Sequence, residues 1–137
     1  VRELAKRSSA EALQDRPLVV NSESTRRFLV DRLGGLHQEV FAVMFLDTRH
    51  RLIRFEQLFT GSLTQTSVYP REVARRSLQL NAAAVVAAHN HPSGTAEPSR
   101  ADQLLTTQLR RSLEVLEIRL LDHLIVAGDR TLQAGEV

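Results

Sequence analysis

The chain has 137 residues and a formal net charge of +2 at pH 7, and 42% of its residues are hydrophobic while 25% are charged. That length suits one domain with a buried core, and this balance of residue types excludes disordered and fibrous proteins. Because the sequence contains no cysteine, it excludes disulfides, thiolate zinc sites and cysteine nucleophiles, so a metal ion would need histidine and carboxylate ligands.

The N-terminal part of the chain divides at Pro17. Residues 1–16 are polar and helix-prone, and we expect a helical arm or the remnant of a preceding region there, followed by one domain over residues 17–137. The first residues lack the apolar core of a signal peptide, and no apolar run approaches the roughly 20 residues that cross a bilayer. The sequence therefore predicts a cytoplasmic protein.

The next three elements follow from the spacing of apolar residues. After "PLVV", which could begin a strand, a helix is predicted from a cap at Asn21 or Ser22, and its inward side chains are Phe28, Leu29 and Leu33. The apolar run over 40–46 predicts a strand buried on both faces, and residues 51–61 predict its return strand after the turn "DTRH". This hairpin could pair with another chain, which predicts a homodimer.

The second half alternates helices and strands. A helix over 68–81 is expected to turn Val73, Ala74 and Leu78 inward, and a short buried strand follows over 82–91. A longer helix is predicted from Ser99 to about Glu117, because leucines recur there at helical spacing: Leu104, Leu105, Leu109, Leu113 and Leu116. With a last strand over 118–128 and a short edge after it, the pattern predicts an α/β fold, a mixed sheet flanked by helices.

The stretch "HNHPSGTAEPSRAD" is the candidate metal site. His89 and His91 lie two residues apart at the end of a predicted strand, so both imidazoles project to the same side. Asp102 would return a carboxylate from the first turn of the next helix. Two histidines and one carboxylate leave a fourth tetrahedral position for water, which is the pattern of a catalytic zinc site.

The same residues allow a second interpretation. Ser99 and Asp102 have the spacing of a capping box, and a carboxylate in the first turn of a helix also favours the helix dipole. A histidine such as His89, after an Ala/Val strand, can be a core residue that bonds a backbone group. We do not expect one carboxylate both to cap the helix and to bind a metal, and spacing alone leaves the two alternatives open.

Nucleic-acid binding is the other alternative that the composition raises. The bases are almost all arginine, but they are spread along the chain, and only 4% of the residues are aromatic. A binding groove for single strands would interleave basic and aromatic side chains. The arginines are therefore interpreted as solvated surface, and nucleic acid is a weakly supported partner.

The motif resembles the JAMM zinc motif of MPN domains, in which His-x-His-Pro is followed by Ser-x-x-Asp. The stretches "LDTRHRLI", "YPREV", "HNHPSGTAEPSRAD" and "LLDHLIV" resemble the bacterial branch called RadC, and the resemblance covers roughly residues 17–137. RadC chains usually carry a helix-hairpin-helix-like region ahead of this domain, so the chain is expected to be a fragment or a stand-alone version.

The resemblance implies a three-layer α+β fold similar to that of cytidine deaminases. It also implies one Zn²⁺ per chain, held by His89, His91 and Asp102 with water as the fourth ligand, and it has Asp102 point at the metal and not back at the chain. Ser99 would stabilise the oxyanion of a tetrahedral intermediate. Glu39 stands at the place of the catalytic glutamate, with the competitors Glu56 and Glu72.

The function implied by the resemblance is a zinc-dependent hydrolase that cleaves a peptide or isopeptide amide bond, with a protein or peptide as its substrate. Glu39 would act as general base. The alternatives are a DNA-associated protein, either a binding module or a metal-dependent phosphodiesterase, and an inactive MPN scaffold. His123, in "LLDHLIV", is interpreted as a structural residue with Asp122 as its neighbour.

Overall fold

The computed structural model describes residues 22–61 and 68–137, so the predictions for residues 1–16 and for the strand at "PLVV" lie outside the described residues. In the described part, three helices and five strands follow one another in the order α2 (Ser22–Leu33), β1 (Val40–Leu46), β2 (Leu52–Thr60), α3 (Pro70–Gln79), β3 (Ala84–Asn90), α4 (Arg100–Glu114), β4 (Arg119–Ala127) and β5 (Arg130–Gln133).

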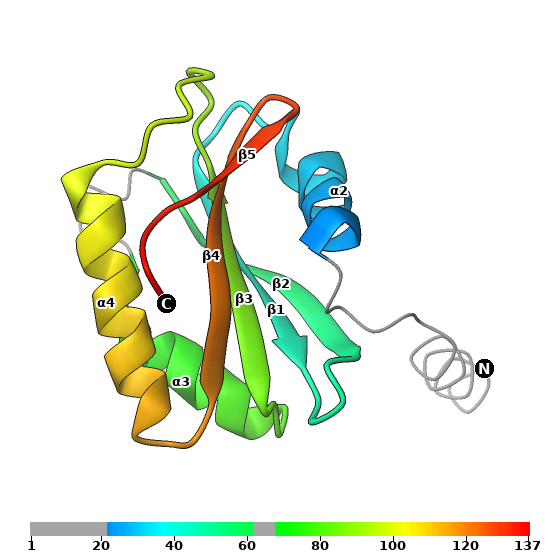
Figure 1. Cartoon of the computed structure of the whole chain (residues 1–137), viewed down its shortest axis with the longest axis vertical. Helices are drawn as coiled ribbons and strands as arrows, with labels where there is room; N and C mark the ends of the chain where they lie inside the picture. Colours follow the sequence, from blue (N-terminus) through cyan, green and yellow to red (C-terminus); the bar gives the residue numbers. More distant parts are fainter. Residues whose placement is uncertain (1–21, 62–67) are drawn as a thin grey trace.

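The strands form one mixed sheet in the order β2-β1-β3-β4-β5 (Figure 1). The pairs β1–β2, β1–β3 and β4–β5 are antiparallel, whereas β3 and β4 run parallel and are joined by α4. In Figure 1, α3 and α4 cover one face of the sheet and α2 covers the other. The fold class is therefore confirmed as α/β with three layers, while the likeness to cytidine deaminases stays a prediction.

Strand β1 shows why the core has two halves. Successive side chains of a strand point to opposite faces. Accordingly, Phe41, Val43 and Phe45 pack with α3 and α4 in one buried cluster, while the intervening Ala42 and Met44 pack with α2 in the other. Every residue of β1 is buried, as the uninterrupted apolar run predicts.

Two of the predicted inward faces are corrected by the structure. On α3, Val73 and Ala74 are buried but Leu78 is 57% exposed. Ser77 takes the buried position instead, one helical turn after Val73, and its hydroxyl donates to the Val73 carbonyl at 2.7 Å. The buried stripe of this short helix therefore passes through Ser77 and not through Leu78.

On α4, only the central leucines of the predicted repeat are buried, namely Leu105, Leu109 and Leu113, whereas Leu104 and Leu116 are exposed. The helix also ends at Glu114 and not near Glu117. Glu117 has a φ of 59°, which is a left-handed conformation, and the backbone N–H of Ile118 returns to the Leu113 carbonyl at 3.0 Å. This turn sends the chain into β4.

No helix within residues 22–61 and 68–137 is both long and apolar enough to cross a membrane.

Candidate metal centre

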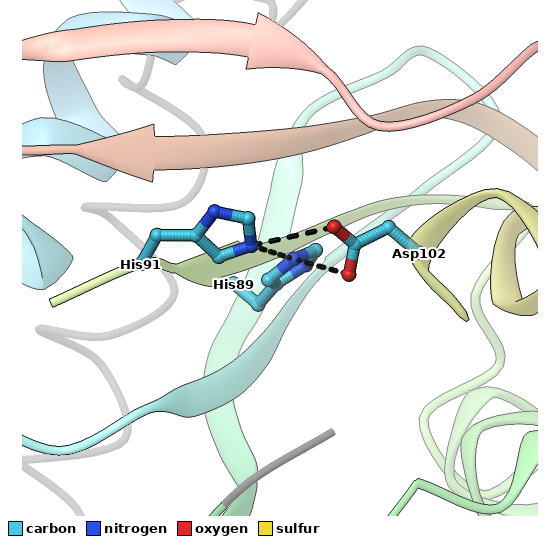
Figure 2. A group of neighbouring side chains, drawn as sticks. All are labelled: His89, His91 and Asp102. Atoms are coloured by element: carbon cyan, nitrogen blue, oxygen red, sulfur yellow. Dashed lines mark hydrogen bonds and ion pairs between the residues drawn. The ribbon is translucent and has the colours of Figure 1, made fainter. Parts of the chain in front are cut away.

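The two histidines of the motif lie at the C-terminal end of β3. His89 is the last but one residue of the strand and is fully buried, and His91 follows the strand with its side chain 14% exposed. Asp102 lies in the first turn of α4 and is 2% exposed. Helix α4 covers the face of the sheet that carries Phe41 and its β3 partner His89. Figure 2 shows the three side chains pointing toward one another.

The distances within this group suit a tetrahedral ion. His89 Nε2 lies 3.0 Å from Asp102 Oδ1, His91 Nε2 lies 3.3 Å from Asp102 Oδ2, and the two Nε2 atoms are 3.2 Å apart. Bonds of roughly 2.0–2.1 Å at tetrahedral angles would place neighbouring ligand atoms about 3.3 Å apart. One ligand atom from each of the three residues therefore fits Zn²⁺ with little rearrangement.

The turn after β3 orients the His91 ring. His91 Nδ1 lies 2.8 Å from the Thr95 carbonyl, and the Gly94 N–H bonds the His91 carbonyl at 2.9 Å. Gly94 has a φ of 85°, which explains a glycine at this point of the turn. Because a carbonyl can only accept, Nδ1 carries the proton, and the Nε2 lone pair of a neutral His91 faces the site.

Asp102 caps α4 and faces the histidines at the same time. The Asp102 N–H donates to Ser99 Oγ at 3.0 Å, and Asp102 Oδ2 accepts from the Ser99 N–H at 2.8 Å, so the predicted capping box is confirmed. The expectation that Asp102 does not point back at the chain is wrong, whereas its role as a metal ligand stays a prediction. A carboxylate has two oxygens, and Oδ1 faces His89 while Oδ2 completes the cap.

The environment of Asp102 keeps its carboxyl group ionised. Burial raises its pKa, but hydrogen bonds from His89 and the Ser99 backbone, together with the charge of the His89 imidazole, outweigh burial and hold the pKa well below its usual value. A metal ligand must be deprotonated. The carboxylate therefore meets this requirement at neutral pH.

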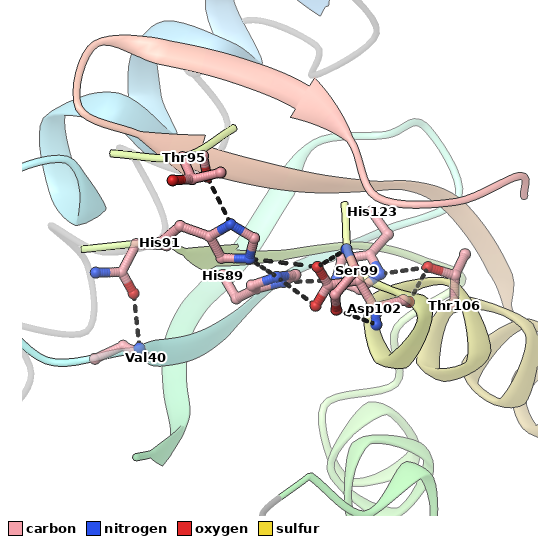
Figure 3. Close-up of polar contacts among 9 residues, drawn as sticks. Val40, His89, His91, Thr95, Ser99, Asp102, Thr106 and His123 are labelled. Carbon is pink, nitrogen blue, oxygen red and sulfur yellow. Dashed lines mark hydrogen bonds and ion pairs between the residues drawn. The ribbon is translucent and has the colours of Figure 1, made fainter. Parts of the chain in front are cut away.

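Behind His89, two further buried side chains continue the hydrogen bonding, and the motif did not reveal either contact. His89 Nδ1 lies 3.0 Å from His123 Nε2, and His123 Nδ1 lies 2.7 Å from Thr106 Oγ1 (Figure 3). Burial, followed by the charge of His89, lowers the pKa of His123 to about 3, so its ring is neutral. Asp122 is a neighbour only through the backbone, because its carboxylate accepts the His123 N–H at 2.9 Å.

Glu39 precedes β1 at the same end of the sheet. Phe41 pairs with His89 in the antiparallel β1–β3 ladder, and this register, continued by two residues, places Glu39 across from His91. Glu39 lies one residue before β1, and the alternation of the strand, continued by that residue, would put it on the same face as Phe41, which is the face that α4 covers. The position of Glu39 thus agrees with its predicted role, which stays a prediction.

Asn90, between the two histidines, holds the backbone on both sides of Glu39. Its Oδ1 accepts from the Val40 N–H at 2.7 Å, and its Nδ2 donates to the Gln38 carbonyl at 2.9 Å. The side chain is 2% exposed and lies on the opposite face of β3 from His89. Sequence reasoning missed this residue, since its role depends on the pairing of two strands about 50 residues apart.

The two competing glutamates are engaged elsewhere. Glu56 lies on β2 across from Val43 and receives two hydrogen bonds from Arg76, at 2.7 and 2.6 Å. The Arg76 hydrogen bonds are the main reason that the pKa of Glu56 lies below its usual value, against the opposing effect of burial. Glu72, in the first turn of α3, pairs with Arg75. Neither carboxylate belongs to the His89–His91–Asp102 group.

Asn90→Asp is expected to destabilise the domain by roughly 1–3 kcal/mol, because a buried carboxylate oxygen would replace the donor to the Gln38 carbonyl. Urea unfolding measures the change. The matched control is Asn81→Asp, since Asn81 is exposed and its left-handed backbone, with a φ of 56°, also suits aspartate. Equal stability of the Asn90 variant and the wild type would contradict the bracing role of Asn90.

Comparison with known proteins connects this geometry to a family. A family model described as the RadC-like JAB domain matches residues 19–134. UPF0758 proteins of Leptothrix cholodnii and Polaromonas sp. are each 52% identical to the chain, covering 99% and 100% of it, and the UPF0758 protein of Methylibium petroleiphilum is 53% identical over 99%. The chain spans 61% of the length of each of these relatives.

Proposed function

This chain belongs to the family of RadC-like JAB domains, and from that premise we propose that it is a zinc-dependent hydrolase of the JAMM type that cleaves a peptide or isopeptide amide bond. The observation that carries the proposal is the convergence of two imidazoles and one ionised carboxylate within 3.0–3.3 Å of one another. Nitrogen and oxygen donors at these separations are those that Zn²⁺ binds in catalytic sites.

His89, His91 and Asp102 would hold the metal. When bound, Zn²⁺ acts as a Lewis acid that polarises a carbonyl group and lowers the pKa of water toward about 7. The buried ligands His89 and Asp102 lie beneath the site, while the partly exposed His91 lies at its solvent side. Substrate would therefore approach past His91, toward the end of β3.

Glu39 is proposed as the general base. It would take a proton from the attacking water as the new C–O bond forms, and it would return that proton to the amine nitrogen as the C–N bond breaks. A base must lie within hydrogen-bond reach of the water, directly or through one other water. The register across from His91 and the bracing of both flanking peptides by Asn90 support this assignment.

Ser99 is proposed to stabilise the developing oxyanion. Its Oγ accepts the Asp102 N–H at 3.0 Å, so the hydroxyl proton is not used in that bond and can be donated outward. The residue is exposed at the start of α4, next to the buried Asp102. A donor at this position would strengthen its bond as negative charge develops on the carbonyl oxygen.

A protein or peptide is the proposed substrate. Nucleic acid receives less support, because Arg75 and Arg76 on α3 are neutralised by Glu72 and Glu56 and offer little free positive charge to a phosphate backbone. The homodimer and the cytoplasmic location stay predictions. Strand β2 is an edge of the described sheet, which leaves the predicted hairpin open to pairing with a second copy.

A peptide-library screen with metal control tests the proposed function. The chain as purified is analysed for metal, treated with a chelator, and restored with Zn²⁺, and each form is incubated with the library and with duplex DNA. We expect close to one zinc per chain and peptide cleavage only in the zinc-containing forms. The proposal would be refuted if the chain failed to take up zinc on titration, or if the chelated form cleaved peptides equally well. Cleavage of DNA alone would favour the phosphodiesterase.

A further inference from the structure

A line of buried hydrogen bonds runs from α4 through β4 to the metal centre (Figure 3). Thr106 Oγ1 donates to the Asp102 carbonyl at 2.9 Å and lies 2.7 Å from His123 Nδ1, and His123 Nε2 lies 3.0 Å from His89 Nδ1. Thr106, His123 and His89 are all 0% exposed. Because these three side chains are shielded from solvent, the hydrogen bonds between them have to be made with protons that the residues themselves carry, and not with water.

The donors can be assigned by counting protons. Thr106 has one hydroxyl proton, and it donates this proton in a hydrogen bond to the Asp102 carbonyl, because a carbonyl can only accept. His123 must therefore donate from Nδ1 to Thr106 Oγ1. A buried neutral imidazole has one N–H, so His123 Nε2 is an acceptor and His89 donates to it from Nδ1. With Nδ1–H used in this bond, Nε2 is the ring atom that faces Asp102 Oδ1 at 3.0 Å, where it can donate to the carboxylate without a metal and offers its lone pair when a metal takes the place of that proton.

We propose that Thr106 and His123 are positioning residues that fix the Nδ1–H tautomer of His89, so that His89 Nε2 is presented as a ligand to a divalent metal. If Thr106 donated to His123 instead, every bond in the line would reverse, and His89 Nδ1 would become an acceptor, so that the only ring proton of His89 would sit on Nε2 and block metal binding there. The Asp102 carbonyl prevents this reversal, so Asp102 supports the site through its backbone as well as through its carboxylate.

Gly135 supports the placement of Thr106. A Cβ added at Gly135 would lie 2.8 Å from Thr106 Oγ1 and 2.9 Å from Thr106 Cβ, so even alanine would displace the threonine. The C-terminal segment that contains Gly135 is held beside Thr106 and His123 by the hydrogen bond from the Ala134 N–H to the His123 carbonyl at 2.7 Å. Glycine is therefore required where the C-terminal segment closes over the hydroxyl.

The inference rests on the proposed metal site, and Thr106→Val tests it with two readouts. Zinc affinity is measured by competition with a chromophoric chelator, and the His89 tautomer is read from the ¹⁵N chemical shifts of the metal-free protein. We expect Thr106→Val to weaken zinc binding by roughly 10- to 100-fold, the usual cost of losing a partner of a metal ligand. Nδ1 of His89 is expected to carry a proton in the wild type and to be only partly protonated in the variant.

Two variants control for damage to the helix. Thr107→Val removes a similar bond, from Thr107 Oγ1 to the Gln103 carbonyl at 3.3 Å, one residue further along α4, and it should leave zinc affinity unchanged. Thr106→Ser keeps the hydroxyl and should restore most of the affinity. Gly135→Ala, which displaces Thr106 without removing its hydroxyl, should weaken zinc binding in the same direction as Thr106→Val.

The outcomes separate this inference from the proposed function. A His89 Nδ1 without a proton in the metal-free wild type, or unchanged zinc affinity in folded Thr106→Val protein, would overturn the positioning role. Absence of zinc binding in the wild type would overturn the proposed function, and the tautomer spectrum would still decide how the line is oriented. Normal zinc binding without any peptide cleavage would refute the hydrolase and leave the positioning role supported.

Discussion

Asp102→Asn is expected to abolish zinc binding at neutral pH while leaving the fold intact. The amide oxygen can still accept from the Ser99 N–H, and the backbone N–H of residue 102 still reaches Ser99 Oγ, so both bonds of the helix cap survive. The ligand charge is lost, and an amide group is a poor zinc donor. The zinc affinity should therefore fall by more than the roughly 100-fold that marks loss of a supporting residue.

Metal analysis and chelator competition measure this change, and thermal unfolding without metal checks the fold. The matched control is Asp122→Asn, because Asp122 also accepts a backbone N–H, that of His123 at 2.9 Å, but lies outside the ligand group. This control should keep one zinc per chain. Zinc affinity equal to that of the wild type in Asp102→Asn would remove Asp102 from the ligand set.

The shared use of Asp102 connects the fold to the site. The first turn of α4 needs acceptors for its free N–H groups, and the metal needs an ionised carboxylate that is held still. One capping box supplies both, since the bonds that satisfy the helix also fix the rotamer of the ligand. Asp102 Oδ2 contacts the Ser99 N–H and His91 together, so the helix terminus and the histidine turn are joined at one atom.

Much of the fold was predictable because periodicity is a local property. The apolar run over 40–46 and the leucines at the centre of α4 each form the element that their spacing predicts. The errors lie where tertiary packing decides: Leu78 has helical spacing, but the buried stripe of α3 passes through Ser77. Leu116 was excluded from α4 because the chain turns at Glu117 to enter β4.

The site was predictable only in part, for a related reason. The ligand group is contained in one stretch of 14 residues, so its spacing is visible in the sequence, and its three members do come together. Thr106 and His123 join the site only because β3 and β4 pair in parallel and α4 packs across them. A histidine and a threonine 17 residues apart carry no signal of such a contact.

Glu39→Gln is expected to keep zinc and lose hydrolysis. Glutamine preserves the size of the side chain and leaves the Asn90 bonds to residues 38 and 40 in place, so the fold and the ligand group should not change. An amide cannot accept the proton of the attacking water. The rate of peptide cleavage should therefore fall by roughly 10²–10⁴-fold, the usual contribution of general acid–base catalysis.

Glu56→Gln is the control for Glu39→Gln. It decides whether the loss of hydrolysis depends on the position of the carboxylate or follows from removing any carboxylate. It removes the ionised partner of Arg76 and should lower stability modestly at neutral pH, with peptide cleavage retained. Because the pKa of Glu56 is depressed in the folded protein, its stabilising effect is present above its unfolded pKa and is lost as the pH falls through the folded value. The stability difference between Glu56→Gln and the wild type should consequently shrink in acid. If Glu56→Gln loses hydrolysis at neutral pH and Glu39→Gln keeps it, the general base lies on β2 and the assignment of Glu39 is wrong.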